Sequence, residues 1–277
     1  MSELKYSFRT DALFKILFGK YQSLLKKFVG HLLEINLEDI VEFVVINPEI
    51  SAEEMKDKFC RLDIRMVVNG QLVDLEIQVM KRKDYTDRCL FYWARQFSTG
   101  IEEGEKYSEL PRSIIISIMD FVQFPNREKA HSEYQCLEVE SHEPLTDKQV
   151  LHFFELPKLV PPSKSDSSKE LWLKLFKVRT EEELIEIDRL EVPEMTEAIK
   201  AYRHIASSNE LANIARALSD AGHEKAQALS DARDEGMEAG MEAGIKQGEE
   251  QEREKWQGVV SEKDAIINEL RAKLAMK

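Results

Sequence analysis

Three polar residues in two short alternating segments are the first candidates for chemistry in this chain. Asp63 lies in 59–68, and Glu76 and Gln78 lie in 71–79; both segments alternate apolar with polar residues. Side chains two positions apart in a β-strand point to the same face of the sheet. The spacing therefore predicts two strands, with Glu76 and Gln78 on one face of the second.

The dipeptide between these strands sets their register. Asn69 and Gly70 form a pair that is typical of two-residue hairpin turns, and such a turn places Asp63 opposite Glu76. Opposed side chains have Cβ atoms about 4.5–5.5 Å apart, so the two carboxylates repel each other unless a cation lies between them. Oxygen ligands favour a hard ion, most simply Mg²⁺, with Mn²⁺ or Ca²⁺ as substitutes. The pattern alone is more typical of the solvent-facing side of an ordinary sheet, where opposed like charges cost little in water.

Apolar periodicity predicts the elements that would position this hairpin. We expect an α/β fold, because the order through residue 119 is α-β-β-β-α-β, which indicates a mixed sheet flanked by helices. The predicted helices are 11–33, with Thr10 as N-cap, and 85–103; the predicted strands are 40–46, 59–68, 71–79, 113–121, 132–140 and 150–156.

The last third of the chain differs in composition. A Pro- and Ser-rich linker is expected at 157–168 and a helix at 169–190, with Pro193 as a break. From 194 to 277 the chain has no proline and is rich in Ala, Glu, Lys and Arg, which predicts a long helical tail. The tail contains Gly236, Gly240, Gly244 and Gly248 and a short heptad pattern at Val260, Ile267, Leu270 and Leu274. We therefore expect a domain at 1–190 and a partly coiled-coil tail at 194–277 that forms a homodimer or higher homo-oligomer.

Composition limits the class of protein. The net charge is −13, which argues against tight non-specific nucleic-acid binding, but residues 1–99 carry 15 basic and 15 acidic residues and are neutral. Three widely spaced cysteines do not indicate a disulfide framework. The chain has no apolar run of the roughly 20 residues that a membrane helix needs. We expect a cytoplasmic protein without a membrane partner.

Several stretches together resemble a known family. They are TDALFKILFG (10–19), LDIRMVVNGQLVDLEIQV (62–79), DRCLFYWARQFSTGIEEGEKYSELPRSIIISIMDF (87–121) and HFFELPKL (152–159). An Asp followed by Glu-x-Gln on a hairpin resembles the PD-(D/E)XK nuclease core, and the chain is most similar to the bacterial Rpn recombination-promoting nuclease and putative transposase family.

The resemblance implies specific roles. Asp63 and Glu76 would be metal ligands together with the backbone carbonyl of Ile77, and Asp11 would be a further ligand, although it also fits as a negative charge at a helix N-terminus. Gln78 stands where the superfamily has lysine; it can orient a water but supplies no cation. Candidate contacts to substrate are Lys15, Arg95 and Gln96, with a solvated lysine as the plainer interpretation of Lys15.

The expected function is therefore a magnesium-dependent DNA endonuclease, with Asp63, Glu76 and Gln78 as its catalytic residues. The resemblance implies a role in DNA recombination, mobile elements or phage defence in a bacterium. Two alternatives stay open: an RNA nuclease with the same site, and a non-enzymatic adaptor on a decayed nuclease fold. An adaptor would tolerate loss of Asp63 and Glu76.

Overall fold

The structure is a computed structural model. It describes residues 2–46 and 64–209 and, beyond them, residues 211–214, 216, 233, 236–237, 240–241, 244–248, 250–253, 255–263, 266 and 268. The chain divides into two compact units, Met1–Leu218 and Ser219–Lys277, which are described separately.

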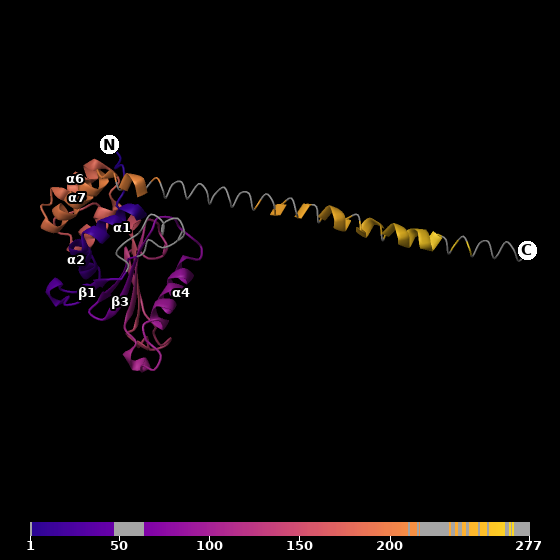
Figure 1. Cartoon of the computed structure of the whole chain (residues 1–277), viewed down its shortest axis with the longest axis horizontal. Coiled ribbons are helices and arrows are strands. Elements are labelled where there is room, and N and C mark those ends of the chain that lie inside the picture. Colours follow the sequence, from indigo (N-terminus) through magenta and orange to yellow (C-terminus); the bar gives the residue numbers. More distant parts are fainter. Residues whose placement is uncertain are drawn as a thin grey trace, which may run out of the picture. The chain divides into compact units, whose positions relative to one another are not determined.

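The described residues of the first unit form two α-helices, three strands, one α-helix, three strands and three α-helices in chain order (Figure 1). Its helices are α1 (Asp11–Lys20), α2 (Gln22–Leu32), α4 (Tyr85–Ser98), α5 (Ser168–Lys177), α6 (Glu181–Asp188) and α7 (Pro193–Ala206). Its strands are β1 (Phe43–Val45), β2 (Ile64–Val68), β3 (Gln71–Gln78), β4 (Ser113–Met119), β5 (His131–Tyr134) and β6 (Gln149–Glu155).

The strands form one mixed sheet in the order β1-β2-β3-β4-β6-β5. β1, β2 and β3 are antiparallel neighbours, β3, β4 and β6 run parallel, and β5 is antiparallel to β6. The parallel connection from β3 to β4 requires a crossover, which α4 provides. This confirms the predicted α/β class with a mixed sheet flanked by helices.

The β2–β3 hairpin has the predicted turn and register. Asn69 and Gly70 both have positive φ, 49° and 74°, as a two-residue hairpin turn needs. Asn69 Oδ1 also accepts hydrogen bonds from the backbone N–H groups of Val41 and Glu42, which ties the turn to the chain before β1. The register pairs Ile64 with Leu75, and Asp63, the residue before Ile64, lies outside the described residues.

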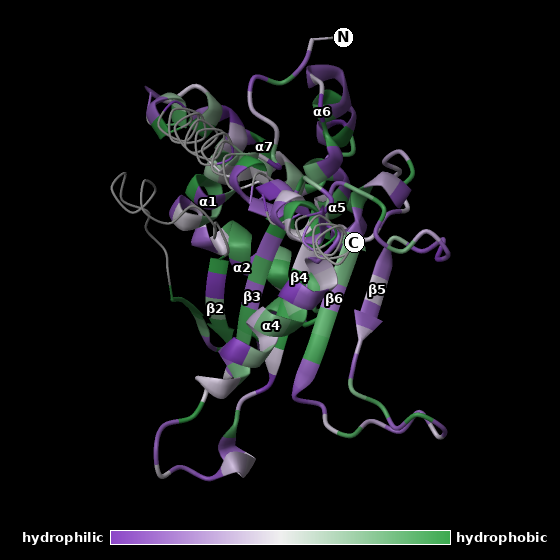
Figure 2. Ribbon diagram, turned by 90° about the vertical axis from the view of Figure 1, so that its right-hand side faces the viewer, coloured by the Kyte–Doolittle hydropathy of each residue, from purple (hydrophilic) through white to green (hydrophobic). Residues whose placement is uncertain are grey.

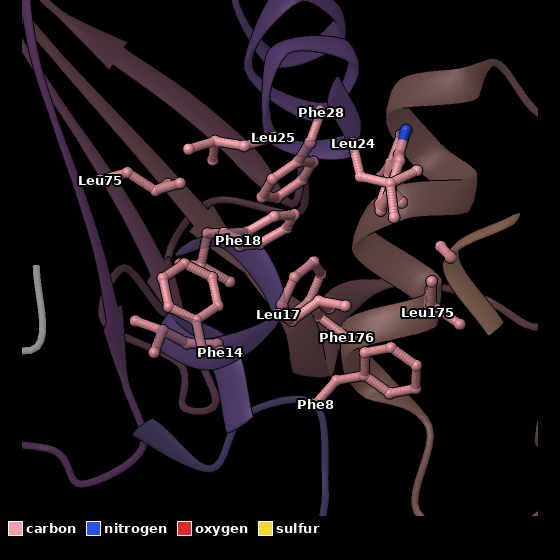
Figure 3. Close-up of a cluster of buried hydrophobic side chains, with 14 of the residues drawn as sticks. Phe8, Phe14, Leu17, Phe18, Leu24, Leu25, Phe28, Leu75, Leu175 and Phe176 are labelled. Carbon is pink, nitrogen blue, oxygen red and sulfur yellow. The ribbon is translucent and has the colours of Figure 1, made fainter. Parts of the chain in front are cut away.

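One face of the sheet carries the main hydrophobic core. Alternate residues of β3, among them Leu75, are buried there against helices α1, α2 and α5. Phe28 is central to this layer, because its ring stacks on Phe18 at 5.4 Å and on Phe176 at 5.0 Å between centroids (Figure 3). Each buried aromatic ring of this kind contributes a large share of the hydrophobic stabilisation. The core therefore fixes β3 from this side.

The other face is covered by α4. A smaller cluster packs there, formed by Tyr85 and Cys89 of α4 with Ile115, Met119, Leu151 and Phe153 of β4 and β6. Figure 1 shows α4 on the side of the sheet opposite α2, and Figure 2 shows the apolar residues concentrated in the central strands. The remaining residues of β3 face this second layer.

Helix boundaries differ from the sequence prediction in four places. The helix predicted at 85–103 is α4, which ends at Ser98. The helix predicted at 11–33 is two helices that meet at Tyr21. The helix predicted at 169–190 is also two, because Thr180 begins α6 with a capping box in which its side chain accepts from Glu183 N. Pro193 begins α7 rather than only ending a helix, since a proline at the first position lacks an N–H that would have no partner there.

Helix α7 belongs to the first compact unit, and the boundary between domain and tail stays a prediction. The first unit extends to Leu218, whereas the sequence placed the domain end near 190. The reason is a buried apolar face of α7, which includes Met195, Ile199 and Tyr202. Tyr202 stacks on Phe8 at 4.4 Å between ring centroids and donates through its hydroxyl to Tyr6 O. Helix α7 is thus part of the first unit.

The described residues of the second unit are helical, and all of them except the half-buried Val259 are exposed. A Cβ added at Gly236, Gly240, Gly244 or Gly248 would meet no atom within 4 Å in the single chain. The heptad prediction is not tested, because Ile267, Leu270 and Leu274 lie outside the described residues. Among the described helices, none combines the length and apolar character needed to cross a membrane.

Candidate active site

The polar residues of β3 lie on the face that α4 covers. Asp74 is opposite Arg65 of β2, and its Oδ2 lies 3.7 Å from Arg65 Nε. Glu76, two residues on, accepts a hydrogen bond from Arg88 of α4, with 3.1 Å between Arg88 Nη2 and Glu76 Oε1. Gln78 completes the series and donates through Nε2 to Met80 O at 2.9 Å. One strand face therefore carries two carboxylates and an amide in a row.

Glu76 lies at the boundary between the buried layer and solvent. Its side chain is 14% exposed. The next strand places Ser117 beside it, and the Ser117 hydroxyl is hydrogen-bonded to the hydroxyl of Tyr85, which is fully buried. A carboxylate in such a position has one side available to a ligand and the other held by protein.

The charge of Glu76 affects its buried neighbours. Burial raises the pKa of Tyr85 well above its ordinary value, and the nearby Glu76 carboxylate raises it further. Burial also raises the pKa of the Cys89 thiol, to about 12, again with Glu76 as the next contribution. Both groups stay protonated at neutral pH. Tyr85 is thus a hydrogen-bonding group, and Cys89 is not a nucleophile.

Arg88 is held between aromatic rings and the carboxylate. Its guanidinium carbon lies 5.9 Å from the centroid of Tyr85 and 5.5 Å from that of Tyr92, within cation–π range. Its side chain is 22% exposed. Its Nε is buried and, among the described residues, has no hydrogen-bond partner. Arg88 therefore has one N–H donor, at Nε, that no described residue accepts.

A second group of charges lies where β3 and β4 end. Asp120 N donates to Gln78 O at 3.0 Å, which continues the pairing of the two strands by one residue. The Asp120 carboxylate forms ion pairs with the buried Arg9 and, at 3.4 Å, with Arg179. Lys81 donates to Val122 O at 2.7 Å nearby in the chain. This edge of the sheet carries positive charge close to Gln78.

The structure places the remaining predicted substrate contacts in different surroundings. Lys15 is not the solvated lysine of the plainer interpretation, because it is buried on α1 and only 7% exposed. Arg95 is exposed on α4. Gln96 donates to Leu72 O at 3.0 Å and to the Ser113 hydroxyl at 2.9 Å, so it links α4 to the opposite end of β3 from Gln78. The amide nitrogen of Gln96 is thus engaged within the fold, and its contact with substrate stays a prediction.

The expected metal ligands are described only in part. Asp63 lies outside the described residues, and the Asp11 side chain does too, although Asp11 begins α1. Within the described part of the chain, no three His, Cys, Asp or Glu residues are grouped as a metal cluster. Glu76 nonetheless fits a hard cation, because its oxygens lie near the surface and already attract a positive group, Arg88.

A comparison with protein families gives a direct result. The family model described as PD-(D/E)XK nuclease family transposase matches residues 8–232, which is most of the chain. The chain belongs to this family of nuclease-type transposases. The searches of curated proteins and of solved structures found no match.

The family match includes the β2–β3 hairpin that carries the candidate site residues. The predicted resemblance to PD-(D/E)XK proteins is confirmed, and the match covers α1 through α7. The six-stranded sheet presents Glu76 and Gln78 on one face, as the alternation predicted. The family description therefore supports a nuclease- or transposase-like role.

Sequence reasoning did not single out Arg88, Tyr85 or Ser117. A signal for the first two existed, because Tyr85, Arg88 and Tyr92 follow the i, i+3, i+7 spacing of one helix face directly after the hairpin. Ser117 had a weaker signal, a single hydroxyl within the apolar run of β4. Its partner could be recognised only once β4 was paired with β3.

Proposed function

We propose that this protein is a metal-dependent DNA endonuclease and that Asp63, Glu76 and the backbone carbonyl of Ile77 hold Mg²⁺. Asp11 is a candidate further ligand. Mn²⁺ or Ca²⁺ would occupy the same oxygen site, with Mn²⁺ also supporting the reaction. When bound, such an ion lowers the pKa of a water and stabilises negative charge on a phosphate.

The observation that carries this proposal is the position of Glu76. In an apolar layer a carboxylate is costly unless its charge is compensated, and here it sits between the Tyr85–Ser117 pair and the surface with Arg88 at 3.1 Å. The register of the β2–β3 hairpin also supports the proposal, because Ile64 is opposite Leu75 and Asp63 directly precedes Ile64 in the sequence. A second carboxylate in this position would create strong affinity for a divalent cation.

The other residues of the site have supporting roles in the proposal. Gln78 orients the attacking water through its amide oxygen, since its amide nitrogen is engaged with Met80 O. Arg95, which is exposed on α4, contacts the DNA backbone. The Tyr85 hydroxyl keeps Ser117 and the neighbouring strand in place and exchanges no proton, because its pKa is far above neutrality.

The test is cleavage of supercoiled plasmid in Mg²⁺ by the wild type, Asp63→Asn and Glu76→Gln. We expect the wild type to nick or linearise the plasmid, EDTA to stop it, and each variant to lose at least about 10³-fold in rate, since the metal site is the source of catalysis. Glu186→Gln is the matched control, because Glu186 is an exposed glutamate on α6.

Three other results would lead elsewhere. Cleavage of RNA but not of DNA would establish an RNA nuclease with the same site. Equal rates for wild type and Glu76→Gln would refute the assignment of Glu76. A wild type that is inert on every substrate, with self-association intact, would favour the adaptor function.

We further propose that the tail mediates self-association. Met237, Met241 and Ile245 recur every four residues and are 68%, 70% and 58% exposed in the single chain. A helical stripe of exposed apolar residues gains stability by packing against a second helix. Replacing all three by glutamate should shift the full-length protein toward monomer in sedimentation velocity. An unchanged oligomeric state would refute this role.

The acidic balance after residue 99, with 24 basic and 37 acidic residues, motivates a second role for the tail. We propose that it restrains the nuclease until DNA binds. Deletion of 219–277 should then raise the cleavage rate on short duplexes. An unchanged rate would remove this proposal without affecting the metal site. The family description supports transposition as the setting. A role in DNA recombination is part of the proposal and is implied by the sequence resemblance.

A further inference from the structure

The polar face of β3 lacks a cation of its own. Its residues Asp74, Glu76 and Gln78 are acidic or neutral, whereas the phosphodiester that a nuclease cleaves is an anion that gains charge at the transition state. A cation from a neighbouring element would therefore help a metal ion to balance that charge. Among the described residues, two arginines form ion pairs with the carboxylates of this face, Arg65 with Asp74 and Arg88 with Glu76.

The contacts of the two arginines differ. Arg65 is opposite Asp74, which is 5% exposed, and that carboxylate lies on the inner part of the strand. Arg88 is paired with Glu76 itself. Arg88 also has the buried Nε without a hydrogen-bond partner among the described residues. Of these two arginines, only Arg88 contacts the expected metal ligand and also has an N–H donor without a partner among the described residues.

Building on the proposed nuclease function, we propose that Arg88 is a catalytic residue that binds the phosphate of the scissile nucleotide beside Glu76. In the structure its guanidinium neutralises Glu76. Once Glu76 is committed to a divalent cation, a guanidinium next to it would face a like charge, which a phosphate between them relieves. The planar guanidinium presents paired donors that match two phosphate oxygens.

The surroundings of Arg88 suit this exchange of partners. The rings of Tyr85 and Tyr92 lie within 6 Å of the guanidinium carbon and would hold its plane while the anion changes from carboxylate to phosphate. The side chain keeps 22% of its surface exposed, so a backbone phosphate can reach it from solvent. The tyrosines thus preserve the position of the charge with or without substrate.

The proposal differs from a purely structural role of Arg88 in the sign of one effect. If Arg88 only positions Glu76, its removal weakens metal binding. If Arg88 competes with the metal ion for Glu76 and serves the phosphate, its removal strengthens metal binding and slows cleavage. The two measurements together separate the roles.

The experiment compares full-length wild type, Arg88→Gln and Arg88→Lys. Mn²⁺ affinity is measured by calorimetry without DNA, and single-turnover cleavage of a plasmid is measured at saturating Mn²⁺. Arg127→Gln is the control, because Arg127 also stacks on a tyrosine, Tyr134, at 5.1 Å but lies in a loop outside this site. Thermal melting of each variant checks the fold.

We expect Arg88→Gln to bind Mn²⁺ several-fold more tightly and to cleave about 10²-fold more slowly, the size seen when one stabilising donor is removed from a transition state. Arg88→Lys should recover part of the rate, because lysine keeps the charge but not the paired donors. Arg127→Gln should behave as wild type.

Two results would overturn the proposal while leaving the nuclease function intact. One is wild-type cleavage by Arg88→Gln at saturating Mn²⁺. The other is weaker Mn²⁺ binding with a rate that higher Mn²⁺ restores, which would make Arg88 a positioning residue. A wild type that neither binds Mn²⁺ nor cleaves would instead refute the proposed function, and the role of Arg88 with it.

Discussion

The two faces of β3 differ in almost every physical respect. On one face Val73, Leu75 and Ile77 pack into a large apolar core with α1, α2 and α5. On the other face Asp74 and Glu76 meet arginines, and a smaller apolar cluster lies beside them under α4. The same eight-residue strand thus belongs to a stabilising layer and to a polar layer.

This difference shows how the fold supports a costly arrangement. Buried carboxylates and arginines add little net stability, because desolvation offsets their attraction. The aromatic layer on the opposite face supplies the stability that holds β3 in register. Changes to the core face should therefore affect folding more than chemistry, and changes to the polar face should do the reverse.

The largest effect on stability should follow from Phe28→Ala. Phe28 is fully buried and stacks on Phe18 and Phe176, so we expect a loss of about 3–5 kcal/mol in the free energy of unfolding. Urea denaturation measures it. Phe91→Ala is the control, since Phe91 of α4 is 62% exposed, and it should change stability by less than about 1 kcal/mol. Equal losses would contradict the division between the two layers.

A smaller effect should follow from Tyr85→Phe on the polar face. The variant removes the hydroxyl that is bonded to Ser117 in a buried site, and we expect a cost of about 1–3 kcal/mol. The matched variant Tyr107→Phe changes a tyrosine that is 84% exposed and should have no measurable effect. If Tyr85→Phe is as stable as wild type in urea, the polar layer does not depend on this bond.

The pH dependence of stability gives a prediction for the far edge of the sheet. His131 Nε2 and His152 Nδ1 are 3.0 Å apart, with Glu133, Glu34, Lys169 and Arg112 as the charged groups that act on them. Burial lowers the pKa of both, that of His152 to about 4. The unfolded chain binds protons first as pH falls, so stability is full above about pH 6.5 and decreases toward pH 4.

This contribution should amount to about 1–2 kcal/mol between pH 7.5 and pH 5. The measurement is urea denaturation at both pH values for wild type and His152→Gln, which removes the titrating group. We expect a smaller pH dependence in the variant. An identical pH dependence in both proteins would assign the effect to other groups.

The sequence predicted the alternation of β3, the turn and the register because each depends on local rules. Two-residue periodicity predicted which side chains share a face, and the conformations open to Asn69 and Gly70 determined the pairing of β2 with β3. The positions at which helices end were harder to predict from the sequence. The helix break at Tyr21, between α1 and α2, was not predicted, because tyrosine is not a helix-breaking residue.

The partners of the site depended on long-range pairing. Arg88 could be placed on a helix from its spacing, but its contact with Glu76 requires the crossover that returns α4 over β3. The burial of Lys15 could not be predicted from its residue type, because lysine side chains are usually exposed to solvent. Gln96 is a predicted contact to substrate, and in the structure its amide nitrogen donates to Leu72 O and to the Ser113 hydroxyl.

The central claim is that the polar face of β3 holds a divalent cation at Glu76. A crystal structure with Mn²⁺, using its anomalous scattering, tests it most directly. We expect one strong anomalous peak about 2.0–2.3 Å from a Glu76 carboxylate oxygen, with Asp63 as a second ligand, and no such peak in Glu76→Gln. A wild-type crystal saturated with Mn²⁺ that shows no peak at Glu76, or a peak that persists unchanged in Glu76→Gln, would contradict it.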